Sequence, residues 1–140
     1  MSSTRTLTLF ASLLAVAGCS SLATTTRTGN IYDVKFEERM TPANLRAQPG
    51  DEIRWVNQRT TPVTVEFLAG ALDAVTCETG FSARGLTNLR GELRESATIA
   101  PNSTASLCFA NAGTVTYNAR MDSAVAGGQL IEAGTLRIGQ

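Results

Sequence analysis

The sequence predicts an all-β domain built as a β-sandwich. Short segments alternate apolar and polar residues with a period of two, the pattern of strands that bury one face. Turn residues, among them Pro49-Gly50-Asp51 and Pro101-Asn102, separate these segments at regular intervals. Residues 30–140 are long enough for one compact domain and too short for two. We therefore expect a single sandwich that follows a separate N-terminal segment.

The N-terminal segment resembles the signal sequence of a bacterial lipoprotein. Arg5 precedes an apolar run that is too short for a bilayer span of about 20 residues. The run closes with Leu14-Ala15-Val16-Ala17-Gly18-Cys19, which is similar to a lipobox. This resemblance implies removal of residues 1–18, a diacylglycerol thioether on the Cys19 sulfur, and a further acyl chain such as palmitate on the new N-terminus. The alternative is an ordinary signal peptide with an incidental cysteine.

Residues 19–29 are interpreted as the lipidated cysteine and a flexible tether. The stretch from Ser20 to Gly29 is small and polar and has no apolar period. Several acyl chains suffice for stable membrane anchoring, whereas a single chain is marginal. Neither Ser20 nor Ser21 is the Asp that often retains such lipoproteins at the inner membrane. The resemblance therefore implies the periplasmic face of an outer membrane.

The expected strands follow from the alternation of side chains. Ile31–Phe36 places Tyr32, Val34 and Phe36 on one face, and Glu52–Asn57 places Ile53 and Trp55 together. Trp55 is expected in the core between the sheets. Asn102 is expected in the left-handed conformation that a tight turn can require. The other expected strands are residues 63–67, 96–99, 105–109, 114–117 and 135–138, the last of them beginning after Gly134.

Residues 68–95 break this pattern. Gly70, Gly80, Gly85 and Gly91 interrupt the segment, and neither a period of 2 nor one of 3.6 persists in it. We expect an irregular insertion that contains one helical turn.

The two cysteines beyond Cys19 are expected to form a disulfide. Cys77 lies in the insertion and Cys108 in an expected strand, and two remaining thiols in an oxidising compartment favour a bond. Leu107 and Phe109 should face inward, so Cys108 should face outward. The bond would then hold the insertion across the outside of the sheet. The alternative is a redox-active or metal-binding pair, although the spacing is not C-x-x-C.

Composition excludes several classes of function. The 12 basic and 12 acidic residues leave no electrostatic footprint for nucleic acid. The absence of histidine removes Ser-His-Asp and Cys-His catalysis, imidazole metal sites and the usual near-neutral general base. We therefore expect neither an enzyme nor a nucleic-acid partner.

The remaining charged residues are interpreted as surface groups. Glu37-Glu38 and Asp51-Glu52 are adjacent carboxylates, which point to opposite faces of a strand and cannot act as an acid/base pair. Arginines and glutamates interleave near the end of the insertion and predict weak surface pairs; they are Arg84, Arg90, Arg94, Glu92 and Glu95.

In the order of its segments the chain resembles a cupredoxin, the plastocyanin-type copper domain. Four pieces carry the resemblance across most of residues 30–140: Phe36 to Pro42 followed by Leu45, Pro49 to Asn57, Ile99 to Ser103 with Phe109, and Ala112 to Tyr117. The resemblance implies a Greek-key, cupredoxin-like β-sandwich.

The copper ligands of that family do not carry over. A blue-copper site uses two His and a Cys with a weak axial Met. The first His often follows a Pro, whereas Val63 follows Pro62 here. The family's Cys lies two residues past the aromatic Tyr117, at Ala119, and the second His should lie near residues 120–122. Met121 is a remnant of the axial ligand at most. We expect no metal and no cofactor.

The sequence thus predicts an envelope lipoprotein that acts as a binding or assembly module. The membrane is reached through Cys19, and an envelope protein is the expected further partner. The loops expected to contact it are the Cys77-bearing insertion and the segment from Met121 to Glu132. The alternative is a copper-handling or electron-transfer relative that binds Cu(I) through Met40, Met121 and free cysteines. It requires reduced thiols and close approach of these side chains.

Overall fold

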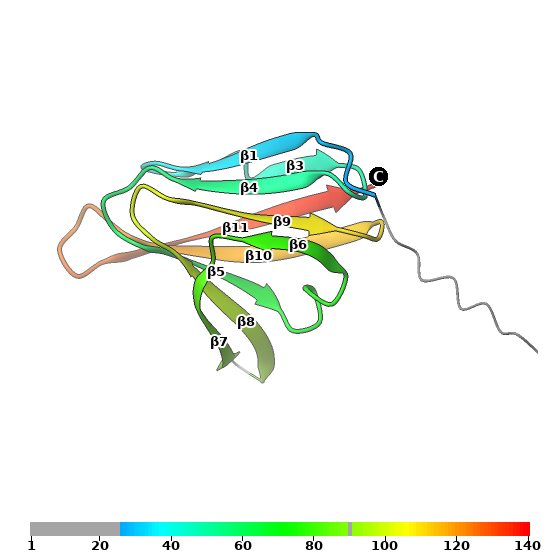
Figure 1. The fold of residues 1–140 in the computed structure, drawn as a ribbon. Helices are drawn as coiled ribbons and strands as arrows, with labels where there is room; N and C mark the ends of the chain where they lie inside the picture. The colour runs from blue at the N-terminus through cyan, green and yellow to red at the C-terminus, as the bar shows by residue number, and fades with distance from the viewer. Residues whose placement is uncertain (1–25, 90) are drawn as a thin grey trace, which may run out of the picture.

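The expected all-β sandwich is confirmed. The computed structural model describes residues 26–89 and 91–140, and its two sheets lie face to face (Figure 1). Within the described residues there is no helix of the length and apolar character needed to cross a membrane. The strands are β1 (Ile31–Phe36), β2 (Met40–Thr41), β3 (Asn44–Ala47), β4 (Glu52–Asn57), β5 (Val63–Leu68), β6 (Val75–Thr79), β7 (Ser82–Leu89), β8 (Glu92–Ile99), β9 (Thr104–Phe109), β10 (Gly113–Asp122) and β11 (Gln129–Ile138).

The chain passes repeatedly between the two sheets. One sheet has the strand order β2-β1-β4-β9-β6, and the other has the order β3-β11-β10-β5-β8-β7. Strands β1 and β4 pair in parallel, as do β3 and β11, while the other pairs are antiparallel. Strands β6 and β7 are consecutive in the chain, and each forms the edge of a different sheet. The insertion therefore lies along one open side of the sandwich.

The core forms where the inward faces of the strands meet. Val34 and Phe36 of β1, and Ile53 and Trp55 of β4, are fully buried, as the alternation predicts. Tyr32 and Leu45 are only partly buried at its margin. Asn102 has a φ of 52° in the turn between β8 and β9, which confirms the expected left-handed turn residue.

Three aromatic side chains join the two sheets at the centre of the core. Trp55 of β4 makes edge-to-face contacts with Phe67 of β5 and Tyr117 of β10, at centroid separations of 5.9 and 5.6 Å. Phe67 and Tyr117 are 5.6 Å apart. Phe81, between β6 and β7, packs against Trp55 from the side of the insertion at 5.8 Å. These contacts combine large apolar burial with favourable ring geometry.

The expectation that residues 68–95 are irregular is wrong. The segment contains β6, β7 and the first half of β8, and successive turns occupy residues 69–74 in place of the expected helical turn. Its glycines obscured the pattern because Gly70, Gly80 and Gly91 lie between strands and Gly85 lies inside β7, where the register shifts. At Gly80, where the chain leaves β6 for β7, φ is +78° and a Cβ would collide with the Thr104 carbonyl, so only glycine fits.

The Pro49-Gly50-Asp51 turn holds the start of the domain. Asp51 was expected to be a solvated surface or turn residue; it adjoins the turn, as expected, but it is not solvated. Asp51 is buried. Its carboxylate accepts hydrogen bonds from the Thr28 hydroxyl, from Asn30 Nδ2 at 3.2 Å and from the Gln48 amide at 2.7 Å. These donors replace the lost hydration of the buried charge. The chain is thus attached to the sandwich from Thr28 onward.

The segment from Met121 to Glu132 is also more regular than expected. Strands β10 and β11 pair from Gly113 opposite Ile138 to Asp122 opposite Gln129, so only residues 123–128 form a loop. The last strand begins six positions before the expected start, and Gly134 lies inside it. The lipobox and Cys19 lie outside the described residues, as does the tether up to residue 25.

We expect Gly134→Ala to destabilise the fold by about 1–3 kcal/mol, the usual cost of overpacking a core. A Cβ at this position would overlap the ring of Tyr117, and Trp55 and Phe67 prevent that ring from moving away. Gly113→Ala is the matched control on the paired strand, because no atom lies within 4 Å of its added Cβ. Urea unfolding of both variants measures the difference. Equal stabilities would contradict the proposed packing of Tyr117 on Gly134.

We expect the stability of the domain to fall as the pH rises from about 10 to about 12. Burial raises the pKa of Tyr117 to about 12, whereas an unfolded tyrosine ionises near pH 10. The neutral phenol therefore stabilises the fold fully below pH about 10, and this contribution is lost through pH about 12. The loss should amount to about 2–3 kcal/mol. Urea unfolding across this range should show a shallower pH dependence for Tyr117→Phe, and identical slopes would contradict the assignment.

Candidate functional site

Val63, Ala119 and Met121, the positions at which the sequence resemblance implies copper ligands, lie at one end of the sandwich. Val63 begins β5, and Ala119 and Met121 lie on β10 beside it. All three side chains are buried members of the core cluster. The neighbouring Arg120 projects to the other face of the sheet, where its Nη2 donates to Glu66 Oε1 at 2.9 Å. These positions supply one thioether and no strong metal ligand.

Arg59 fastens the loops that cover this end. Its Nη1 donates to the carbonyl oxygen of Glu37, after β1, and its Nη2 donates to that of Asp122, at the end of β10. Arg59 itself follows β4, so one guanidinium joins three separate parts of the chain. The Arg59 side chain thereby closes this end of the sandwich.

Asn57 connects the same loops through hydrogen bonds of its side-chain amide. This buried amide donates through Nδ2 to the carbonyl oxygens of Thr61 at 2.9 Å, Ile99 at 3.2 Å and Ala100 at 3.0 Å. Its Oδ1 accepts from the Arg59 amide at 3.0 Å. Sequence reasoning placed Asn57 at the end of a strand and missed this role, because nothing in the sequence marks which carbonyls a single amide will reach.

Pockets of mixed polar and apolar lining lie around Arg59. One of about 440 Å³ is lined by residues that include Glu38, Arg59, Asp122 and Ser123. Among the described residues, no three His, Cys, Asp or Glu side chains are grouped so that they could hold a metal ion. This end of the sandwich therefore consists of loops that are joined by hydrogen bonds.

The structure does not bring together the four side chains of the alternative Cu(I) site. Met121 lies near the end of β10, beside the loops that Arg59 fastens. Cys108 lies opposite Glu52 at the start of β4, at the other end of the sandwich. Met40 and Met121 are both buried in the core, and the two cysteines are bonded to each other.

The expected disulfide between Cys77 and Cys108 is present, but its placement differs from the prediction. The two residues are register partners on neighbouring strands β6 and β9, with Cα atoms 4.9 Å apart. The bond therefore joins the edge strand to its own sheet and does not cross the outside of it. Leu107 and Phe109 belong to the core cluster, as expected, and Cys108 between them does not, yet its side chain is fully buried.

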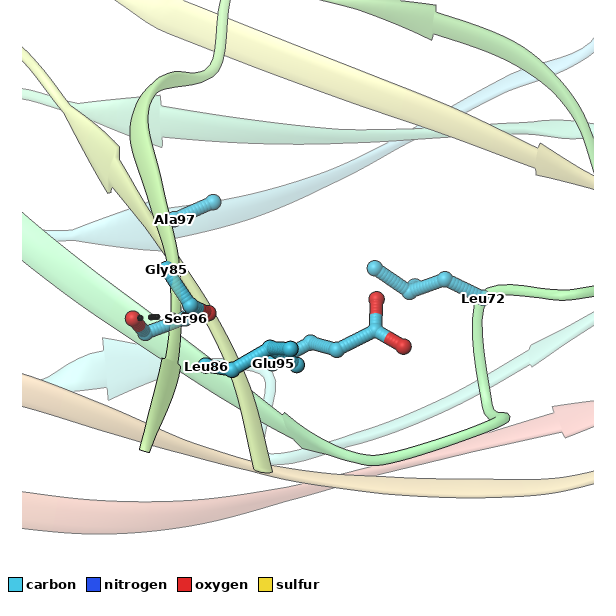
Figure 2. Close-up of a pocket in the computed structure, with 6 residues that line it drawn as sticks. All are labelled: Leu72, Gly85, Leu86, Glu95, Ser96 and Ala97. Carbon is cyan, nitrogen blue, oxygen red and sulfur yellow. Dashed lines mark hydrogen bonds between the residues drawn. The ribbon is translucent and has the colours of Figure 1, made fainter. Parts of the chain in front are cut away.

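The insertion forms a largely apolar pocket. Figure 2 shows Leu72, on the turn before β6, facing strands β7 and β8 across a pocket of about 400 Å³. Leu86, Ala97, Gly85 and Ser96 line the side of the strands. The carboxylate of Glu95 extends from β8 towards Leu72 in the same view. Glu95 lines this pocket, where Gly70 N donates to its Oε1 at 3.4 Å.

A second pocket continues from the first. It has a volume of about 350 Å³ and shares Leu72 and Glu95 with its neighbour. Its other lining residues are Asp73, Val75, Thr76, Cys77 and Glu78. The two pockets thus form one groove with an apolar part and an acidic part, which we call the insertion groove. Sequence reasoning selected the insertion through Cys77 but missed Leu72, Leu86 and Glu95, because no sequence signal pairs a turn with a later hairpin.

Comparison with known proteins identifies the fold. No protein-family model matches the chain, and neither does any curated protein. Among solved structures, a reduced tryptophan-to-tyrosine variant of amicyanin superposes with a TM-score of 0.52 at 19% identity, covering 83% of this chain and 88% of that one. The Cu(I) form of a methionine-to-alanine amicyanin variant gives 0.51 at 21% identity with the same coverage. The chain has a cupredoxin-like fold.

We expect removal of the disulfide to destabilise the domain by roughly 3–4 kcal/mol, since the bond closes a loop with a sequence separation of 31. Cys77→Ala with Cys108→Ala is the suitable double variant, because Ala leaves no unpaired polar group at the buried Cys108 position. Urea unfolding of the oxidised parent and the double variant measures the loss. The reduced parent is the control, and it should behave like the double variant. A difference under about 1 kcal/mol would contradict a stabilising role.

Proposed function

We propose that this protein is a copper-free, cupredoxin-like binding module held in the bacterial cell envelope by a lipid on Cys19. Its role is to bind an envelope protein and not to transfer electrons or catalyse a reaction. The proposal places it at the periplasmic face of the outer membrane. The lipobox resemblance supports the anchor, and Ser20 and Ser21 support the choice of membrane.

One observation carries the copper-free assignment. Val63 and Ala119 occupy the positions where the resemblance to cupredoxins implies His and Cys, and both side chains are 0% exposed. Filling these positions with hydrocarbon lets the core pack without a metal. The chain also contains no histidine with which a shifted alignment could restore the site.

The disulfide argues against the Cu(I) alternative. A thiolate is the form of cysteine that binds metal, and both candidate sulfurs are held in the bond between Cys77 and Cys108. The thioethers of Met40 and Met121 remain, and two thioethers alone are weak ligands for copper in an aqueous compartment.

A metal and thiol assay tests the proposed function. The fragment from Ser20 to Gln140 contains every described strand and the whole core cluster, so it retains the folded unit. We expect this fragment, purified from an oxidising compartment and offered Cu(I) and Cu(II), to retain no stoichiometric copper, show no blue absorption and contain no titratable thiol. Amicyanin treated in the same way is the positive control. Stoichiometric copper together with a free thiol would contradict the proposal.

The anchor is tested on the full chain. We expect labelled palmitate to be incorporated into the protein in a bacterial host, and Cys19→Ala to abolish the incorporation because the acceptor sulfur is lost. Cys77→Ala is the control, and it should leave labelling unchanged. Labelling that persists in Cys19→Ala would contradict anchoring at this residue.

A further inference from the structure

The insertion groove combines two kinds of chemistry within one surface feature. Leu72, Leu86 and Ala97 supply apolar surface at one part. Asp73 and Glu95 supply carboxylates at the other part. Among the described side chains that line the groove, none is basic. A ligand that fits must therefore present an apolar group and, beside it, positive charge.

The geometry of the hairpin keeps this surface accessible. Leu86 of β7 is the register partner of Glu95 of β8, so their side chains project to the same face of the sheet. Leu93, two residues before Glu95, shares that face. Leu86 is 66% exposed and Leu93 is 49% exposed, which is unusual for large apolar side chains that lie so near each other. A cluster of this kind indicates a contact surface.

The scaffold beneath the groove is rigid on the side of the turn. The disulfide between Cys77 and Cys108 joins β6 to β9, and Phe81 packs on Trp55 where the chain crosses to β7. Leu72 is partly buried against the core. The groove wall is therefore formed before any ligand arrives, which lowers the entropic cost of binding.

We propose that the insertion groove binds an extended polypeptide segment that carries apolar and basic side chains at every second position, on the face turned towards the groove. Charge complementarity selects the basic residues, and Leu72, Leu86 and Ala97 accept the apolar ones. An open groove with two adjoining parts suits an extended chain, which spaces its side chains regularly, better than it suits a small molecule, for which sites are enclosed. This inference rests on the proposed function and names the partner chemistry of the same module.

The test uses a defined probe, an acetylated and amidated hexapeptide in which leucine and lysine take turns at every second position and serine fills the positions between them. We expect the isotopically labelled fragment from Ser20 to Gln140 to show saturable amide shifts that are centred on Leu72, Leu86 and Glu95. Binding should weaken when the salt concentration is raised, because exposed charges are screened. Peptides with glutamate in place of lysine, or serine in place of leucine, should not produce these shifts.

Matched variants assign the two parts of the groove. Leu86→Ser should weaken binding about tenfold through lost apolar contact, whereas Ile31→Ser, which changes an exposed apolar side chain on β1, should have no effect. Glu95→Gln should weaken binding up to about fivefold, whereas Glu38→Gln, at the loops around Arg59, should have none. Glu95→Gln keeps the test decisive if Leu86→Ser fails to fold.

Other outcomes overturn the inference. If the glutamate peptide produced the same amide shifts as the lysine peptide, the groove would not select basic side chains and the proposal would be wrong. If the amide shifts of the groove residues changed with protein concentration in the absence of peptide, the occupant would be a second copy of the chain. An absence of saturable shifts would also contradict the proposal. Copper in a fragment that still binds the peptide would contradict only the proposed function, and a copper-free fragment that does not bind it would contradict only this inference.

Discussion

The contact between Trp55, Phe67 and Tyr117 is the interaction on which the sandwich depends. Trp55 belongs to one sheet and the other two rings to the facing sheet, so the cluster fixes how the sheets lie against each other. It requires Gly134, because only a residue without a Cβ leaves room for the Tyr117 ring on the paired strand. Phe81 extends the cluster towards the insertion and thereby connects the groove wall to the core.

Val63, Ala119 and Met121 are packed in the core at one end of the sandwich. Arg59 and Asn57 fasten the loops there by hydrogen bonds to backbone carbonyls. Hydrogen bonds between separate parts of the chain thus stabilise this end of the sandwich. The surface with binding chemistry lies elsewhere, along the open side between β6 and β7.

Sequence reasoning predicted the strands whose two faces differ strongly in polarity. It missed the elements whose position is set by distant parts of the chain. The alternation in Glu52–Asn57 gave the bounds of β4, and the predicted pairing of Cys77 with Cys108 was confirmed. Strand β7 was missed because an edge strand that carries glycine has no clean alternation. Asp51 was misplaced at the surface, since its burial depends on donors from residues 28–30. The insertion groove depends on Leu72 meeting a later hairpin, which no local pattern encodes.

The most direct test of the account is the methyl spectrum of the fragment from Ser20 to Gln140, recorded during titration with Cu(I) under conditions that keep the disulfide intact. The methyl groups of Ala119, Met40 and Met121 report on the end of the sandwich where copper would bind. The account predicts that these resonances stay unchanged at stoichiometric copper. Selective shifts of Met121 and Ala119, with the remaining core methyl groups unaffected, would show that this end holds a metal and would contradict the copper-free assignment.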